Sequence, residues 1–219
     1  KLNQTAAKDL DSADQLAGFR SQFVIEDPSL IYLDGNSLGR LPKKTKELAQ
    51  EIVSEQWGTR LIRSWNERWL EDTVRIGDKV GSVVGAKQGE VVLADSTTVC
   101  LFKAAVSALL SNPTRSVILT DDQNFPSDIQ ALKAAASAVS RDHKVVVIES
   151  NGVEAPVEEL LEAIDETVAL VSLSQVSYRS GWCWDLSMIS QEAHNVGAKV
   201  LWDLSHSVGV VPIDLRKDE

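Results

Sequence analysis

Short apolar runs alternate with longer amphipathic segments from about residue 72 onward. The runs predict strands at residues 91–93, 117–120, 144–148, 168–173 and 198–201, and the longer segments predict helices at 74–84, 99–110, 126–138, 156–164 and 185–195. Strands that are apolar almost throughout and alternate with helices are typical of parallel sheets covered on both faces. The pattern therefore predicts an α/β fold, with a mostly parallel sheet sandwiched by helices.

The N-terminal part of the chain has a less regular pattern. Residues 5–23 predict one short helix, residues 31–33 a short strand, and residues 43–57 an amphipathic helix. Residues 34–39 form a turn in which two glycines frame Asn36 and Ser37. This turn is either a plain surface turn or a loop whose backbone and small side chains come close to a ligand.

Residues 61–69 combine aromatic and basic side chains at unusual density. Arg63, Trp65, Asn66 and Trp69 fall within nine positions. Such a set suits recognition of an aromatic carboxylate, and it equally suits a subunit interface. Composition alone favours the interface, because indoles pack more often than they contact ligands.

Polar side chains follow the predicted strands at their carboxyl ends, where parallel sheets bind ligands. Asp203 directly follows an apolar strand, and a buried carboxylate requires a cationic or protonated partner. His206 comes three residues later, and Ser174 follows the strand at 168–173. These residues predict a site at one edge of the sheet.

Two further strand ends add groups of other kinds to this inventory. Ser96 and Thr97 open a predicted helix, where free N–H groups and hydroxyls would hold a phosphate. Phe125 offers a ring that can stack, and it is followed by Pro126, Ser127 and a second carboxylate, Asp128. A phosphate cradle, a stacking ring, a hydroxyl and a buried acid together fit pyridoxal phosphate.

Each of these residues also has a plainer interpretation. Ser96, Thr97 and Ser127 could be helix caps, Phe125 a core residue, and His206 a histidine satisfied by local hydrogen bonds. A hydrolase triad built on Asp203 and His206 is a poor competitor, because the sequence lacks a GxSxG elbow. The dinucleotide fingerprint and the P-loop are absent as well.

Composition and charge restrict the class of partner. The chain of 219 residues carries 32 acidic and 22 basic side chains, a net charge of −10, which disfavours nucleic acid and anionic membranes as partners. Its two cysteines supply neither a disulfide framework nor a zinc ligand set, so no metal is expected. A small-molecule ligand and a cytoplasmic location follow as expectations. The first and last residues suggest that both ends are cuts.

Five motifs together resemble the kynureninase family, which belongs to the class V aminotransferase-like enzymes of fold type I. They are YLDGNSLG at 32–39, LIRSWN at 61–66, DST at 95–97, NFPSD at 124–128 and WDLSHS at 202–207. The likeness runs from about residue 9 to residue 215 and corresponds to the N-terminal half of such an enzyme. WDLSHS is the least specific motif, because related aminotransferases and cysteine desulfurases carry similar segments.

The resemblance implies a pyridoxal 5′-phosphate enzyme. It implies a homodimer with shared active sites, which hydrolyses L-kynurenine, or its 3-hydroxy form, to anthranilate and L-alanine in tryptophan catabolism and NAD biosynthesis. It also implies an N-terminal segment, residues 1–60, belonging to the small domain or dimer arm, and a cofactor-binding large domain, residues 61–219, that is incomplete at its C-terminal end.

The resemblance also implies roles for individual residues. Ser96 and Thr97 would bind the phosphate, Phe125 would stack on the pyridine ring, and Asp128 and Asp203 would lie near its nitrogen. The remaining implied cofactor contacts are Pro126, Ser127, Ser174 and His206. Residues toward the substrate, some of them serving the neighbouring subunit, would be Asn36, Ser37, Arg63 and Trp65.

One departure from the family pattern concerns the lysine that forms a Schiff base with the cofactor. That lysine is expected roughly 25 residues beyond Asp203, outside this sequence, and Lys217 is too early to take its place. The chain alone is therefore expected to be inactive. The alternatives are another fold type I enzyme, such as a cysteine desulfurase-like protein, and a non-catalytic fragment that binds or regulates a partner.

Overall fold

The structure is a computed structural model that describes residues 3–217. The chain forms two compact units, one ending at Leu70 and the other beginning at Glu71. The predicted domain boundary between residues 60 and 61 concerns the organisation of the whole protein and stays a prediction.

The first unit is built from short helices. They are α1 (Gln4–Ala13), the 3-10 helix η1 (Ala17–Gln22), α2 (Lys43–Glu51), and the π-helical segments η2 (Ile52–Arg60) and η3 (Trp65–Trp69). The single helix predicted at 5–23 is wrong, because α1 ends at Ala13. There the Asp14 side chain accepts a hydrogen bond from the N–H of Leu16 (2.8 Å) and starts a turn.

The strand predicted at residues 31–33 is also wrong. These residues pair with no other strand, and Ile31 is 82% exposed. The Tyr32 hydroxyl instead donates to the carbonyl of Leu38 (2.6 Å) and closes the turn that contains Asn36 and Ser37. A strand is stabilised by its neighbour, and the apolar run at 31–33 has none.

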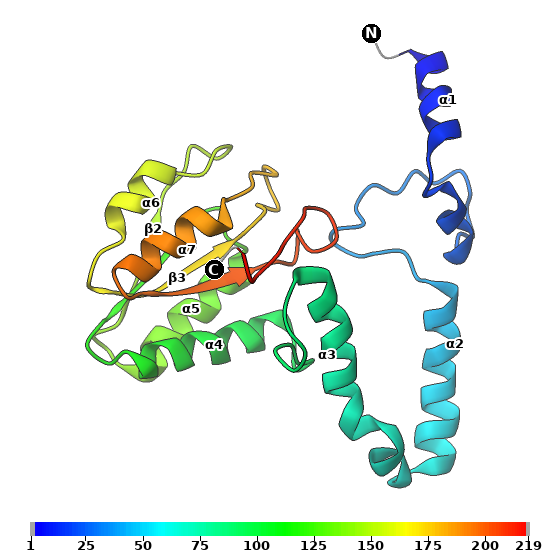
Figure 1. Cartoon of the computed structure of the whole chain (residues 1–219), viewed down its shortest axis with the longest axis horizontal. Coiled ribbons are helices and arrows are strands. Elements are labelled where there is room, and N and C mark those ends of the chain that lie inside the picture. Colours follow the sequence, from blue (N-terminus) through cyan, green and yellow to red (C-terminus); the bar gives the residue numbers. More distant parts are fainter. Residues whose placement is uncertain (1–2, 218–219) are drawn as a thin grey trace. The chain divides into compact units, whose positions relative to one another are not determined.

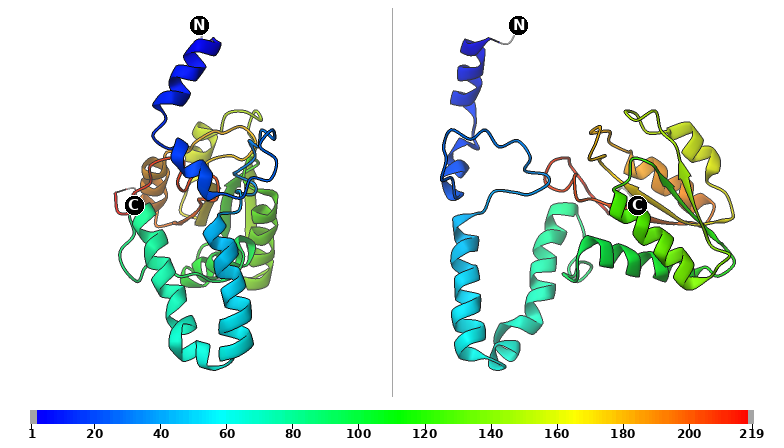
Figure 2. Two further views of the ribbon diagram at one scale, coloured as in Figure 1. Left: turned by 90° about the vertical axis from the view of Figure 1, so that its right-hand side faces the viewer. Right: turned by 180° about the vertical axis from the view of Figure 1, so that it is seen from behind.

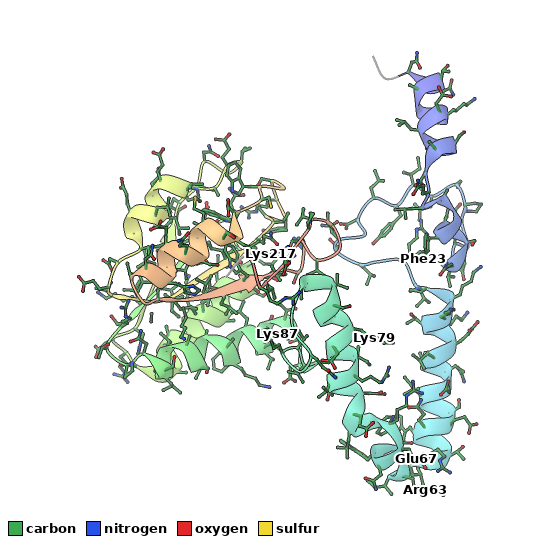
Figure 3. The ribbon with its side chains drawn as sticks, viewed as in Figure 1. Phe23, Arg63, Glu67, Lys79, Lys87 and Lys217 are labelled. Carbon is green, nitrogen blue, oxygen red and sulfur yellow. The ribbon has the colours of Figure 1, made fainter. Side chains whose placement is uncertain are left out.

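The helix predicted at 43–57 is observed as α2 and continues through η2 to Arg60. The chain then turns back at Leu61, which has a φ of 55°, a left-handed value that is uncommon for a branched residue. Figure 2 shows this reversal between η2 and η3. Arg63 and Glu67 both lie at the turn (Figure 3).

The second unit contains a four-stranded sheet. Its strands are β1 (Val117–Asp121), β2 (Lys144–Ile148), β3 (Val168–Ser174) and β4 (Lys199–Asp203), all parallel and in the order β2-β1-β3-β4. Its helices are α3 (Leu70–Val84), α4 (Thr97–Ser111), α5 (Pro126–Val139), α6 (Val157–Ala163) and α7 (Leu186–Asn195). These elements agree with the predicted ones to within a few residues.

Helices α4 to α7 cover the sheet on both faces (Figure 1). Ile118 and Leu170 pack with α4 and α5 in one buried cluster, while Leu119 and Val171 pack with α6 and α7 in the other. Neighbouring strand residues point to opposite faces, so both faces must be apolar. The predicted fold class, a mostly parallel sheet sandwiched by helices, is confirmed.

The strand predicted at residues 91–93 is wrong. These residues join no sheet, and the N–H of Leu93 donates to the carbonyl of Thr73 in α3 (3.3 Å). Gly77 in α3 allows this approach, because a Cβ at that position would overlap the carbonyl oxygen of Val91. The apolar run therefore packs against a helix instead of forming a sheet ladder.

Candidate active site

The order of the strands identifies where a ligand site is expected. β1 connects through α5 to β2 on one side, whereas β3 connects through α7 to β4 on the other. Connections that leave two neighbouring strands in opposite directions create a switch point, and ligands bind beyond the carboxyl ends of those strands. The residues after β1 and β3 are therefore the first candidates.

Two carboxylates, Asp128 and Asp203, face each other at this edge of the sheet. Asp128 lies in the first turn of α5 with 1% of its surface exposed, and Asp203 ends β4. Burial, followed by the negative charge of Asp203, raises the pKa of Asp128 to about 6. The sequence predicted that both acids belong to one site, and the structure places them together.

Hydroxyl groups orient the Asp203 carboxylate. Its Oδ1 accepts from the N–H of Ser205 (2.8 Å) and from the Ser205 hydroxyl (2.5 Å), while its Oδ2 lies 3.2 Å from the Ser174 hydroxyl. Ser127 donates to Oδ1 of Asp128 (3.3 Å). Asp128 Oδ2 is buried and receives no hydrogen bond within the described residues 3–217.

Three aromatic rings surround the same edge. The Phe125 ring lies 5.0 Å from the Tyr178 ring and 6.3 Å from the His206 ring, measured between centroids and in edge-to-face geometry. Tyr178 and His206 are also 6.3 Å apart. Phe125 is 40% exposed, so it is not a core residue, and one part of its ring can stack on a ligand.

Tyr178 was missed by the sequence analysis. It follows β3 by four residues, in a loop that an isolated bridge between Val176 and Cys183 folds back toward the strand end. An aromatic residue just beyond a strand whose end was already a candidate was the available signal. The folding back of this loop, which brings the Tyr178 ring to Phe125 and His206, could not be read from the sequence.

The N-terminus of α4 supplies hydrogen-bond donors. Ser96 occupies the N-cap position, and its side chain makes no capping hydrogen bond there. The hydroxyls of Ser96 and Thr97 and the N–H groups of the first helical turn can therefore bind an anion. Ser127 is not a cap, because Phe125 is the N-cap of α5 and Pro126 follows it. Ser96 is therefore an N-cap by position, without a side-chain capping hydrogen bond, whereas the interpretation of Ser127 as a cap is wrong.

A further buried acid lies at the end of β1. Asp121 is 1% exposed, and its carboxylate has no hydrogen-bond partner of good geometry within the described part of the chain. Burial raises its pKa to about 6, although the Trp184 side chain and the N–H groups of Asn124 and Gln123 lower it in part. The sequence analysis did not single out Asp121.

The four predicted substrate residues belong to the first unit. Ser37 donates to the Asp34 carboxylate (2.8 Å) within the turn that also holds Asn36. The Arg63 guanidinium donates to the carbonyls of Thr59 (3.0 Å) and Arg60 (3.1 Å), and Trp65 lies edge-to-face with Trp69 at 6.1 Å. Their role toward a substrate stays a prediction.

Lys217, which the sequence analysis did not nominate, pairs with Asp214 at 3.1 Å. Across residues 3–217 no cluster of three or more potential metal ligands occurs, and no helix has the length and apolar character needed to span a bilayer.

Residues 31–218 match the family model described as aminotransferase class-V. Because the match spans most of the sequence, the chain belongs to the aminotransferase class-V family. Within curated proteins it is 39% identical to a kynureninase from Pseudomonas fluorescens over 213 residues, which make up 95% of this chain and 50% of that protein. The predicted resemblance to kynureninases is confirmed, and the chain spans about half the length of the curated relatives it matches.

Solved structures agree on the fold. The cysteine desulfurase CsdA from Escherichia coli superposes with a TM-score of 0.73 at 21% identity, covering 94% of this chain and 52% of that one. A C-DES mutant with glycine covalently linked to its PLP cofactor superposes with a TM-score of 0.70 at 18% identity, covering 91% and 53%. At these identities the likeness shows the fold alone.

The residues at the strand ends fit the cofactor predicted from the sequence. Asp128 and Asp203 provide acids for a protonated ring nitrogen, Phe125 provides a partly exposed ring, and the start of α4 provides anion donors. The aminotransferase class-V family and the kynureninase relatives indicate pyridoxal 5′-phosphate as the cofactor, as predicted.

Proposed function

We propose that the intact protein hydrolyses L-kynurenine to anthranilate and L-alanine with pyridoxal phosphate. The observation that carries this proposal is the pair of carboxylates Asp128 and Asp203, held beside Phe125 at the switch point of the sheet. The relative from Pseudomonas fluorescens, matched over 95% of this chain, supports the choice of substrate.

Asp203 acts in this proposal through its charge. Its carboxylate would hold a proton on the ring nitrogen, and the N–H and hydroxyl of Ser205 keep its Oδ1 in place. When bound, pyridoxal phosphate supplies a sink for the electrons released at the α-carbon of the substrate. Asp128, whose pKa burial and the charge of Asp203 raise to about 6, would be the second acid beside that nitrogen.

The other site residues bind and orient. Phe125 would stack on the ring, His206 would line its edge, and Ser96 and Thr97 would hold the phosphate together with the free N–H groups of α4. Asn36, Ser37, Arg63 and Trp65 would recognise the substrate, some of them in the neighbouring subunit of a homodimer. A cytoplasmic location completes the proposal.

Anthranilate fluorescence tests the proposed reaction. The intact protein, mixed with pyridoxal phosphate and L-kynurenine, should release anthranilate, and Asp203→Asn should lower the rate by at least about 100-fold because it removes the charge. Ser150→Ala, in a loop after β2, is the matched control and should leave the rate unchanged. Absence of anthranilate from a cofactor-loaded wild-type protein would refute the proposal.

Cysteine is the substrate that distinguishes a cysteine desulfurase-like enzyme from the proposed kynurenine hydrolase. A cysteine desulfurase-like activity is supported here only by the fold likeness to CsdA. Formation of alanine and persulfide from cysteine, without anthranilate from kynurenine, would favour that alternative over the proposed function.

A further inference from the structure

Asn124 lies at the centre of the hydrogen bonds between the ends of β1 and β3. It follows β1 by three residues and is 2% exposed. Its Nδ2 donates to Thr120 Oγ1 (3.0 Å) and to the carbonyl of Ser172 (3.2 Å). Its Oδ1 accepts from the N–H of Phe125 (2.8 Å) and from the Ser174 hydroxyl (3.0 Å). All four hydrogen-bonding positions of the amide are used.

These bonds cross the switch point of the sheet. Thr120 belongs to β1, whereas Ser172 and Ser174 belong to β3, the two strands whose connections leave in opposite directions. The same amide fixes the N–H of Phe125, the residue whose ring lines the site. One buried side chain therefore sets both the spacing of two strand ends and the start of α5.

Ser174 links Asn124 to the acid of the site. Its single hydroxyl hydrogen has two acceptors in range, Asn124 Oδ1 at 3.0 Å and Asp203 Oδ2 at 3.2 Å. A hydroxyl donates one hydrogen at a time. When Asn124 accepts it, Asp203 Oδ2 keeps its lone pairs for a cationic partner.

We propose that Asn124 is a positioning residue for the cofactor site. It holds Phe125 in the orientation needed for stacking, and it draws the Ser174 hydrogen away from Asp203 so that this carboxylate pairs fully with a protonated ring nitrogen. This inference rests on the proposed function and deepens it, because it assigns a role to Asn124 beyond its place in the NFPSD motif.

The chemistry requires an amide at this position. Ionised aspartate has the same shape but no donor, so Thr120 Oγ1 and the Ser172 carbonyl would lose their partner. A fourth carboxylate would also join Asp121, Asp128 and Asp203 at this edge of the sheet. Protonated aspartate regains one donor and loses its charge. An Asn124→Asp protein should therefore recover function as the pH falls.

Cofactor affinity is the direct measurement. In the intact protein, freed of cofactor, quenching of tryptophan fluorescence by added pyridoxal phosphate gives Kd for the wild type and for Asn124→Asp. We expect Asn124→Asp to raise Kd about 10- to 100-fold at pH 8, as loss of buried hydrogen bonds predicts. The ratio of variant to wild-type Kd should fall to about threefold or less at pH 5.5.

Asn151→Asp is the matched control. It makes the same chemical change at an asparagine whose side chain accepts hydrogen bonds from the backbone of its own turn. Asn151 is exposed in the loop after β2, and its Oδ1 accepts from the N–H groups of Val153 and Glu154. Its Kd ratio should stay near one at both pH values. The visible absorption of the bound cofactor should change for Asn124→Asp and remain unchanged for Asn151→Asp.

Thr120→Val keeps the experiment decisive if Asn124→Asp fails to fold. It removes one acceptor of the Asn124 amide with little change of shape, and we expect Kd to rise about three- to tenfold. A folded variant at either position with wild-type Kd and absorption would overturn the positioning role. Failure of the wild type to bind pyridoxal phosphate or to release anthranilate would instead overturn the proposed function.

Discussion

The two compact units differ in what becomes of their apolar residues. In the second unit, Leu119, Leu132 and Leu170 are 1% exposed or less and lie in two clusters on opposite faces of the sheet. Within the described residues 3–70, no apolar side chain is buried, and Leu33 is 88% exposed. The second unit thus encloses its own core, whereas the first has apolar surface to place against another surface.

The difference shows that apolar side chains are buried within one unit and exposed in the other. A sheet with helices on both faces buries side chains inside one unit. Short helices joined by long loops, as in the first unit, expose them to a partner. This observation supports the proposed homodimer, in which residues 31–69 would contribute to a subunit interface.

The largest expected effect is a difference between the two units in how much stability is lost when a leucine is truncated. Leu132→Ala in α5 should lower the free energy of unfolding by about 2–5 kcal/mol, because it leaves a cavity in a closed core. Leu33→Ala should change it by less than about 0.5 kcal/mol in the monomer. Urea unfolding of both variants measures the difference, and equal losses would contradict the comparison.

The second effect concerns the buried acid at the end of β1. Asp121 has a pKa of about 6 in the folded protein against an ordinary value of 3.8. The folded state therefore binds more protons than the unfolded state between about pH 4 and 6, so stability is greater below this window and falls as the pH rises through it. The pKa of Asp128 is also raised to about 6, so Asp128 changes the stability with pH in the same direction.

Asp121→Asn should remove the part of this pH-dependent loss of stability that is due to the Asp121 carboxyl. The variant should unfold at a free energy higher by at most about 3 kcal/mol at pH 7 and show a smaller decrease between pH 4 and 6. Asp9→Asn, an exposed change in the first unit, is the control. Urea titrations at several pH values measure both, and a steeper decrease in Asp121→Asn would refute the assignment.

The third effect tests whether exposed apolar residues of the first unit contribute to the interface of the proposed homodimer. Replacing Ile31 and Leu33 by Ser should raise the dissociation constant of the proposed homodimer at least about tenfold, or ~1.4 kcal/mol. Val153→Ser, at an exposed position in the second unit, should leave it unchanged. Sedimentation of the intact proteins at several concentrations measures both, and unchanged dissociation in the double variant would remove these residues from the interface.

The smallest effect compares two arginines that bind backbone carbonyls. Arg115 donates to the carbonyls of Val168 (3.0 Å) and Val196 and so joins the start of β3 to the end of α7. Arg63 donates to the carbonyls of Thr59 and Arg60 on the exposed end of η2. Arg115→Met should cost about 1–2 kcal/mol of unfolding free energy and Arg63→Met less than about 0.5. Thermal unfolding that ranks them the other way would contradict this.

Much of the second unit was predictable because its strands are short, apolar and separated by amphipathic helices. Residues 117–120, 144–148 and 168–173 were recognised as strands, and Phe125, Asp128 and Asp203 were proposed as site residues from their places after strands. Ser96 was proposed from its place at the start of a helix, since the strand expected before it does not exist. A buried parallel strand requires apolar residues on both faces, so its continuous apolar run can be recognised in the sequence alone.

Residues 31–33 and 91–93 show the limit of that reasoning. Both runs are apolar, yet one is exposed beside a turn and the other packs on α3 through Gly77. A strand exists only when a neighbouring strand accepts and donates its hydrogen bonds, and that neighbour is chosen by the fold.

The sequence by itself determined the α/β class, the cofactor chemistry and the order of groups along the strand ends. Only the tertiary structure decided that Asp128 faces Asp203, that Tyr178 reaches Phe125, and that Asn124 joins β1 to β3. The physical reason is separation along the sequence. The pattern of apolar and polar residues in a segment indicates which of its side chains are buried. Hydrogen bonds, ring contacts and pKa shifts instead depend on groups that the fold brings together from segments far apart in the chain.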